Sequence, residues 1–258
     1  MSKLRVSTVQ IPLVWEDADA NIAQLDEHLQ QLQGKTDLII LPEMFTTGFS
    51  MHPVNIAEPM NGKTMTWMQA TANALNAVIT GSVIIEDKGG YYNRLLWVRP
   101  DGSYETYDKK HLFTLAGENK NYKSGDQKLI VALNDWKVCP LICYDLRFPV
   151  WARNVEAYDL LIYTANWPSM RREAWKTLLA ARAIENQCYV VGVNRIGTDF
   201  NDYPYSGDTS VIDYGGQVLY RCADVVAINT LEISRANMLA FREKLNFLAD
   251  QDKFEIIK

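Results

Sequence analysis

The chain carries the stretch VCPLICYDLRFP at residues 138–149. An apolar, strand-like run ends there on Cys143, polar residues follow at once, and Pro149 opens a helical pattern. In open α/β sheets, a thiol at the carboxyl end of a buried strand is held rigidly and faces the crevice where reactive groups lie. Taken alone, Cys143 is better interpreted as a core residue, because free cysteine is among the most buried residue types.

Two further strand-like segments also end on reactive groups. The run DLIILPE ends on Glu43, and the segment YDKKHL, which contains Lys109, follows an alternating run at residues 95–98. A thiol attacks only as a thiolate, so it needs a base or a nearby cation. A carboxylate can take the proton, and an ammonium can hold an oxyanion. Glu43, Lys109 and Cys143 therefore predict an acyl-transfer site that uses no histidine.

Length and charge limit the possible functions. The 258 residues suit one α/β domain or two small ones, with ample material for a core. The net charge is −5, from 26 basic and 31 acidic residues, and no basic stripe interleaved with aromatic residues is visible. Nucleic acid is therefore not expected as a partner. An acidic chain also cannot draw anionic substrates by its global field, so any carboxylate must be bound locally.

The cysteine and histidine patterns are those of a reduced protein without a cofactor. The four cysteines form no CxxC, and Cys139 and Cys143 lie roughly 13 Å apart on an extended strand, beyond disulfide reach. The N-terminus has no apolar signal core, and no apolar run approaches the ~20 residues of a membrane span. No histidine pair, GxGxxG or Walker loop is present. We expect a cytoplasmic protein with no metal, no cofactor and no membrane partner.

The pattern along the chain alternates between strand and helix, which predicts the α/β class. It contains no linker, low-complexity stretch or fixed-period repeat, so we expect a single domain over residues 1–258. Strand-like runs fall at 4–10, 38–41, 78–85, 95–99, 128–132, 137–143, 160–165, 189–194, 210–213 and 225–229. Helical patterns fall at 21–33, 64–75, 150–156, 172–186 and 234–249, and hairpin turns at 100–102 and 214–216.

Three segments together resemble a known family. Leu41-Pro42-Glu43, Tyr107-x-Lys109-x-His111-Leu112 and Cys143-Tyr144-Asp145-x-Arg147-Phe148-Pro149 resemble the signature segments of the nitrilase superfamily, also called carbon–nitrogen hydrolases, in the family's order and spacing. Residues 43–49 and 144–149 look most like its omega-amidase branch. The resemblance implies a four-layer α-β-β-α sandwich. It also implies a homodimer, for which helix 172–186 and the C-terminal segment are the candidate contacts.

The resemblance also implies roles for individual residues. Cys143 would attack an amide carbonyl, release ammonia and leave a thioester, with Glu43 as the general base. Lys109, which the family pattern selects over Lys110, would stabilise the oxyanion together with the backbone N–H of Tyr144. Glu118 is the only glutamate between Lys109 and Cys143, and it would hydrogen-bond Lys109 and help to position the substrate.

The substrate implied by the resemblance is a 2-oxo dicarboxylate monoamide, 2-oxoglutaramate or 2-oxosuccinamate, the product left when an amide amino acid donates its amino group, as in methionine salvage. The carboxylate of such a substrate needs a cation in the pocket. We expect Arg171 or Arg172 to supply it. Phe45, Tyr144 and Trp167 would form the pocket walls.

Other functions fit the same residues. The site could serve an aliphatic amidase, an N-carbamoyl hydrolase or a nitrilase, and a binding protein on this fold could retain the motifs. A papain-like Cys–His site is disfavoured because no histidine has the expected setting. We interpret His111 as structural, Lys110 as a solvated charge, and Asp145 with Arg147 as an ion pair that fixes the turn. Arg182 and Glu185 form a second expected pair, at i and i+3 of a helix.

Overall fold

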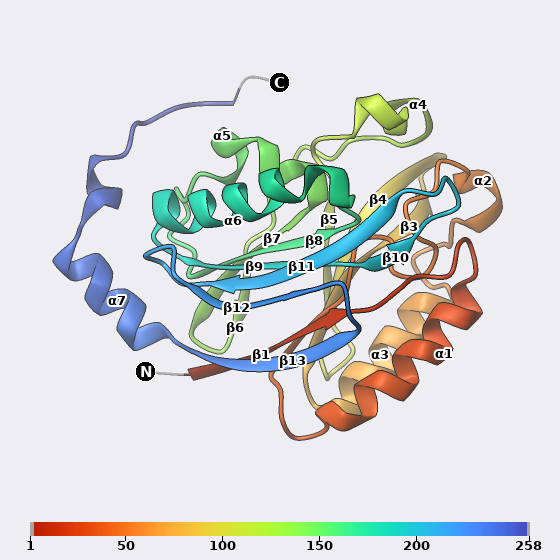
Figure 1. Ribbon diagram of the computed structural model, residues 1–258, viewed down its shortest axis with the longest axis horizontal. Coiled ribbons are helices and arrows are strands. Elements are labelled where there is room, and N and C mark those ends of the chain that lie inside the picture. The colour runs from red at the N-terminus through yellow and green to blue at the C-terminus, as the bar shows by residue number, and fades with distance from the viewer. Residues whose placement is uncertain (1–2, 257–258) are drawn as a thin grey trace.

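The computed structural model describes residues 3–256. It contains two β-sheets packed face to face, with helices against both outer surfaces (Figure 1). The first sheet has the strand order β13 (Ala227–Ser234), β1 (Lys3–Gln10), β2 (Leu38–Ile40), β3 (Val78–Asp87), β4 (Gly90–Val98), β5 (Tyr104–Asp108). The second has the order β10 (Ile196–Thr198), β11 (Pro204–Ile212), β9 (Tyr189–Asn194), β8 (Leu160–Ala165), β7 (Trp136–Ile142), β6 (Val131–Leu133), and β12 (Val218–Ala223) pairs with β11.

Each sheet has a parallel centre and antiparallel flanks. Strands β1, β2 and β3 run parallel, as do β7, β8 and β9, and the remaining pairs are antiparallel. The parallel strands bring their carboxyl ends to one edge of their sheet, where open sheets bind ligands. The helices are α1 (Ala18–Leu29), α2 (Pro53–Ile56), α3 (Lys63–Leu75), α4 (Glu118–Asn121), α5 (Pro149–Ala152), α6 (Arg172–Asn186) and α7 (Arg235–Lys244).

Side-chain alternation along the strands builds the layers. In β2, Leu38 and Ile40 join the core between the sheets, whereas Ile39 joins the core beneath α1 and α3. In β8, Ile162 faces the other sheet and Leu161 faces α5 and α6. This period of two, with both faces buried, is what a strand in the middle of a sandwich requires. The predicted α-β-β-α sandwich is confirmed.

The differences from expectation lie at edges and ends. Strands β5, β10 and β12 were not predicted. β5 is largely polar, β10 has only three residues, and β12 lacks the alternation of a half-buried strand. The helix predicted over 150–156 is only the short α5. Beyond it the side chain of Asn154 donates to the carbonyl of Tyr158 (2.9 Å), and its backbone N–H donates to Asn186 Oδ1 (2.9 Å). These bonds satisfy the backbone outside a helix.

The helix after the last strand is shorter than expected. Helix α7 ends at Lys244, not at 249 as expected, and a short 3₁₀ turn at Phe247–Asp250 follows. Figure 1 shows the remaining chain, in blue, leaving α7 and running along the outside of the molecule. Across residues 3–256, no helix is long and apolar enough to cross a membrane. In the same described part of the chain, no group of three or more His, Cys, Asp or Glu side chains could hold a metal ion.

Candidate active site

Cys143 directly follows β7 and begins a 3₁₀ turn, Cys143–Arg147. Its φ is 41°, in the left-handed region that side chains with a Cβ rarely adopt. Such residues cluster at functional sites, where the surrounding structure holds the strain. The thiol is 8% exposed, and Sγ lies 3.8 Å from the carbonyl oxygen of Asn166, which follows β8. The turn therefore aims the sulfur across the carboxyl ends of two neighbouring strands.

Asp145 holds this turn in place. Its buried carboxylate accepts hydrogen bonds from the Ile142 N–H (3.1 Å), the Tyr107 hydroxyl (2.7 Å) and the His111 N–H (3.0 Å), and it also bonds His111 Nδ1 (2.8 Å). The His111 ring stacks on Phe148 with 3.6 Å between centroids. His111 is thus held by a carboxylate and a ring, in line with a structural role.

The ion pair expected between Asp145 and Arg147 does not form. Hydrogen bonds from neighbouring groups saturate Asp145, and the Arg147 guanidinium instead lies 4.9 Å from the ring centroid of Trp167, lining a cavity. The second expected pair is present, with Arg182 3.0 Å from Glu185.

Three buried ionic side chains meet beside the thiol. Lys109 Nζ donates to Glu43 Oε1 (2.8 Å) and to Glu118 Oε1 and Oε2 (3.1 and 3.0 Å). Lys109 follows β5, Glu43 follows β2, and Glu118 begins α4. Asn93 of β4 donates from Nδ2 to both Glu43 (2.8 Å) and Glu118 (3.1 Å). Because an unpaired buried charge is costly, this mutual pairing is what keeps the cluster in the core.

The charges of the cluster are set by these contacts. Burial alone would lower the pKa of Lys109, but the carboxylates of Glu118 and Glu43 outweigh it and raise that pKa. Lys109 is therefore an ammonium. Burial, opposed by Lys109, raises the pKa of Glu118.

Cys143 is a protonated thiol in this resting arrangement. Burial and the nearby charge of Glu43 raise its pKa well above the ordinary range, although Lys109 opposes them. Glu43 Oε2 accepts the Asn166 N–H (2.9 Å), and the Asn166 side chain donates to the Glu43 carbonyl (2.5 Å). Glu43 is thus fixed close to the thiol and can take its proton when an acyl group approaches.

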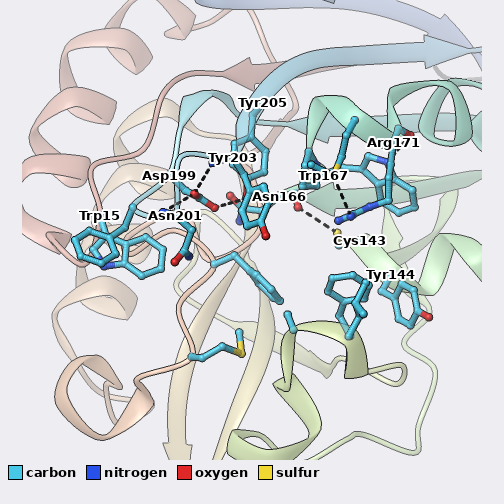
Figure 2. A pocket seen from close by; sticks show the side chains of 18 of the residues that line it. Trp15, Cys143, Tyr144, Asn166, Trp167, Arg171, Asp199, Asn201, Tyr203 and Tyr205 are labelled. Atoms are coloured by element: carbon cyan, nitrogen blue, oxygen red, sulfur yellow. Dashed lines mark hydrogen bonds between the residues drawn. The ribbon is translucent and has the colours of Figure 1, made fainter.

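A cavity of about 600 Å³ opens beside Cys143 and Lys109. Tyr144, Trp167 and Arg171, three of the residues expected to bind substrate, line it. The Tyr144 ring packs edge-on against Phe113, 5.0 Å between centroids, and the Arg171 guanidinium lies 5.1 Å from the centroid of the same ring. Figure 2 shows these side chains around the thiol.

Two expected binding residues do not reach the cavity. Phe45 is fully buried in the core beneath α1 and α3, where its ring lies 5.8 Å from that of Trp67. Met44, at φ 42°, turns the chain between Glu43 and Phe45, so the two side chains part. Arg172 donates to Asp208 (3.0 Å) and lies 3.8 Å from Asp224, so its charge is already paired away from the cavity.

Several polar residues of the site were not singled out from the sequence. Asn93 lies inside a strand, and Asp199 and Tyr205 flank the turn before β11, so none follows an apolar run. Asn166 directly follows β8, and its contact with Glu43 depends on how the two sheets pack. Arg147 had been assigned to an ion pair. Its place at the cavity was signalled only by its position after the nucleophile.

Comparison with known proteins agrees with this geometry. The family model described as carbon–nitrogen hydrolase matches residues 5–243. The chain belongs to this family. It is 43% identical over 258 residues to the omega-amidase YafV of Yersinia enterocolitica, covering 100% of both chains. It is also 30% identical to a 2-oxoglutaramate amidase of Bacillus subtilis, covering 96% of this chain and 97% of that one.

A solved structure shows the same fold at similar identity. The crystal structure of XC1258 from Xanthomonas campestris, a CN-hydrolase superfamily protein with an arsenic adduct in its active site, superposes with a TM-score of 0.98. The two chains are 43% identical, and each is covered over 100% of its length. The nitrilase-superfamily resemblance is confirmed.

Proposed function

We propose that the protein is an omega-amidase that hydrolyses the terminal amide of 2-oxo dicarboxylate monoamides. Its substrates would be 2-oxoglutaramate or 2-oxosuccinamate, and its products the 2-oxo dicarboxylate and ammonia. The similarity to an omega-amidase and to a 2-oxoglutaramate amidase supports this reaction. The observation that carries it is a cavity that joins Cys143 and its buried ionic cluster to arginines without a carboxylate partner.

Acylation begins when Cys143 Sγ attacks the amide carbonyl and Glu43 accepts the thiol proton. Negative charge develops on the carbonyl oxygen. Lys109 Nζ has three N–H groups and contacts one oxygen of Glu43 and both oxygens of Glu118. With a single N–H shared between the two Glu118 oxygens, the third N–H would donate to the oxyanion. The backbone N–H of Tyr144 is the second donor. When the carbon–nitrogen bond breaks, Glu43 gives its proton to the nitrogen, and ammonia leaves a thioester on Cys143.

Deacylation uses the same groups with water as the nucleophile. Glu43 accepts a proton from the water as its oxygen attacks the thioester carbonyl. The carbon–sulfur bond then breaks, and the proton returns to the departing sulfur. Glu118 does not touch the reacting atoms in this scheme. It accepts hydrogen bonds from Lys109 and is itself fixed by the Phe113 N–H, which donates to Glu118 Oε2 at 2.5 Å.

Two arginines suit the substrate carboxylate. Arg147 and Arg171 both line the cavity and lie over aromatic rings. Neither makes an ion pair within residues 3–256, whereas Arg172 is paired with Asp208. An arginine fork binds a carboxylate through two parallel hydrogen bonds, and an aromatic platform reduces the freedom that binding must remove. We therefore assign the carboxylate to Arg147 and Arg171.

Steady-state kinetics with 2-oxoglutaramate and an uncharged amide of equal length test this function. We expect wild type to prefer the charged amide, and Arg147→Met and Arg171→Met each to raise KM for it by at least about tenfold. Arg172→Met is the matched control, because its charge is paired elsewhere. If wild type hydrolyses both amides equally and neither variant raises KM, the protein is a general aliphatic amidase.

Three further expectations accompany this proposal. The protein would act in the cytoplasm, after transamination in methionine salvage.

It would also form a homodimer through α6 and the C-terminal segment, which expose the apolar side chains Ile184 and Phe247. Sedimentation of wild type and Ile184→Glu checks the dimer, since a charge at a dimer contact should shift the protein toward monomer.

A further inference from the structure

The cavity is larger than the proposed acyl group requires. Pockets of about 300–1,000 Å³ hold drug-sized ligands, whereas 2-oxoglutaramate has only about ten non-hydrogen atoms. At about 600 Å³, the cavity has room beyond Cys143 and the two arginines. Its outer part is lined by residues with no role in the reaction above, among them Trp15, Asp199, Phe200 and Tyr203.

This outer part lies away from Tyr144, across Cys143 (Figure 2). Figure 2 shows Trp15, Asp199, Asn201 and Tyr203 on one side of Cys143, and Arg171 and Tyr144 on the other. Asn166, whose N–H binds the general base Glu43, lies between Cys143 and Asp199 in the same view. An acyl group held by the arginines would therefore direct its amide nitrogen, and any substituent on it, toward the outer part.

The surface of the outer part is aromatic. The rings of Trp15 and Phe200 stack with 5.8 Å between centroids and 18° between planes. Phe200 is 72% exposed, and Tyr203, three residues along the same segment, is 46% exposed. Exposed apolar side chains that gather around a pocket mark a binding surface, unlike those scattered singly. A polar group as small as ammonia needs no such surface.

Hydrogen bonds shape the wall in the absence of any ligand. Asp199 Oδ1 accepts the backbone N–H groups of Asn201 (2.8 Å) and Tyr203 (3.1 Å), and Oδ2 accepts the Tyr205 hydroxyl (2.8 Å). This side chain fixes the turn that carries Phe200.

Arg195 joins the two segments that form the wall. Its buried guanidinium lies 4.7 Å from the Tyr205 ring centroid and donates to the carbonyls of Leu13 and Thr198, each at 3.1 Å. It thereby ties the segment of Trp15 to the segment of Phe200. A surface held this way gives up little freedom when it binds.

We propose that the outer part is a leaving-group subsite, and that the enzyme also cleaves N-substituted omega-amides whose amine portion is apolar or aromatic. This rests on the proposed function, because the acyl portion is the same. Cys143 forms the carbon–sulfur bond as the carbon–nitrogen bond breaks, and Glu43 passes the thiol proton to the nitrogen. A primary amine leaves in place of ammonia, and water releases the 2-oxo dicarboxylate.

The test compares 2-oxoglutaramate with its N-benzyl amide, with released benzylamine measured by chromatography. We expect kcat/KM for the N-benzyl amide to lie within about tenfold of that for 2-oxoglutaramate. If wild type cleaves 2-oxoglutaramate but not the N-benzyl amide, the subsite proposal fails and the proposed function stands. If neither is cleaved, both fail.

Variants locate the effect. Phe200→Ala should lower kcat/KM for the N-benzyl amide about tenfold more than for 2-oxoglutaramate, through KM, and Phe200→Trp should restore it. Tyr104→Ala, which removes an aromatic side chain 46% exposed and outside the cavity, should change kcat/KM for neither substrate. An equal loss for both substrates in Phe200→Ala would show that the wall is only structural and would overturn the subsite.

Discussion

The two sheets of this protein hold their parts of the site by different means. The first sheet supplies Glu43, Asn93 and Lys109, and these side chains are placed by the charges and hydrogen bonds they share. The second supplies Cys143 and Asn166. There the nucleophile is placed by its backbone, through a left-handed φ of 41° and a turn that Asp145 holds.

Because the two sheets hold their parts differently, substitutions in them should affect the stability of the fold to different degrees. With Glu118, the first-sheet cluster has two carboxylates and one ammonium in the core, and it is tolerated only while each charge has its partner. The second-sheet group is neutral, and its thiol takes part in no ion pair. Removing a charge from the cluster should therefore destabilise the fold as well as stop the reaction. Removing the thiol should stop the reaction alone.

The largest effect is expected for Cys143→Ala. Turnover should fall by at least about 10⁴-fold, since nothing else near the cavity can form the thioester. The melting temperature should change little. Alanine and cysteine both carry a Cβ and bear the same strain at this φ, and no charge is lost. Ammonia release and calorimetry on one preparation check both halves. A large fall in melting temperature would contradict the expectation that removing the thiol leaves the stability of the fold unchanged.

Lys109→Met should affect both properties. We expect turnover to fall by at least about 10²-fold. The free energy of unfolding should fall by about 3 kcal/mol at neutral pH, because two buried carboxylates lose their cation.

The stability loss in Lys109→Met should depend on pH with a definite sign. Without Lys109, the pKa of Glu118 rises further above its unfolded value of about 4.3. An acid with a raised folded pKa is penalised only when ionised, so the deficit should be small near pH 4 and grow as pH rises to 8. Denaturant unfolding across this range measures it. Lys110→Met is the control, since Lys110 lies outside the cluster, and a similar effect there would show that the wrong lysine was chosen.

A smaller effect is expected for Asp145→Asn, which changes the turn and leaves every proposed reacting group in place. An amide presents N–H groups to donors that the carboxylate accepted, so stability should fall by about 2 kcal/mol. Turnover should fall by about tenfold, because the altered turn no longer holds Cys143 Sγ in the position for attack. If turnover is unchanged although the protein is destabilised, the turn does not position Cys143.

The smallest expected effect is a shift in the pH dependence of alkylation at Cys143. The thiol pKa is raised by burial and by Glu43, so alkylation by iodoacetamide should stay slow at neutral pH and rise above the ordinary thiol range. Glu43→Gln removes a negative charge and should move the midpoint to lower pH. Cys222 is partly exposed, so it would also be alkylated, and peptide-level mass spectrometry separates its signal from that of Cys143. A midpoint that moves upward would contradict the assigned contact.

The groups at strand ends could be predicted because a local pattern marks them. Glu43 and Cys143 each close a strand-like run, and apolar runs predicted the central strands of both sheets. Lys109 follows β5, which was not predicted, so the resemblance of its segment to the family marked it. The family resemblance supplied the layer order, which periodicity alone could not.

The remaining features depend on tertiary geometry. Asn93 reaches the cluster only because its face of β4 turns inward, and Phe45 misses the cavity because the backbone reverses at Met44. Arg172 is paired with Asp208, whereas Arg147 has no acidic partner within residues 3–256, because packing decides which carboxylates an arginine meets. Strand β5 carries too few apolar residues to be recognised before its partner is known, and β12 is apolar but shows no alternation between apolar and polar residues.

The account depends most on a covalent bond between Cys143 and the acyl group. Rapid quenching of wild type with 2-oxoglutaramate, followed by mass spectrometry of the peptide that contains Cys143, measures that bond directly. We expect an adduct with the mass of the substrate less ammonia, lost when the quenched peptide is treated with hydroxylamine and absent from Cys143→Ala. Turnover without any adduct, or an adduct on another residue, would contradict the account.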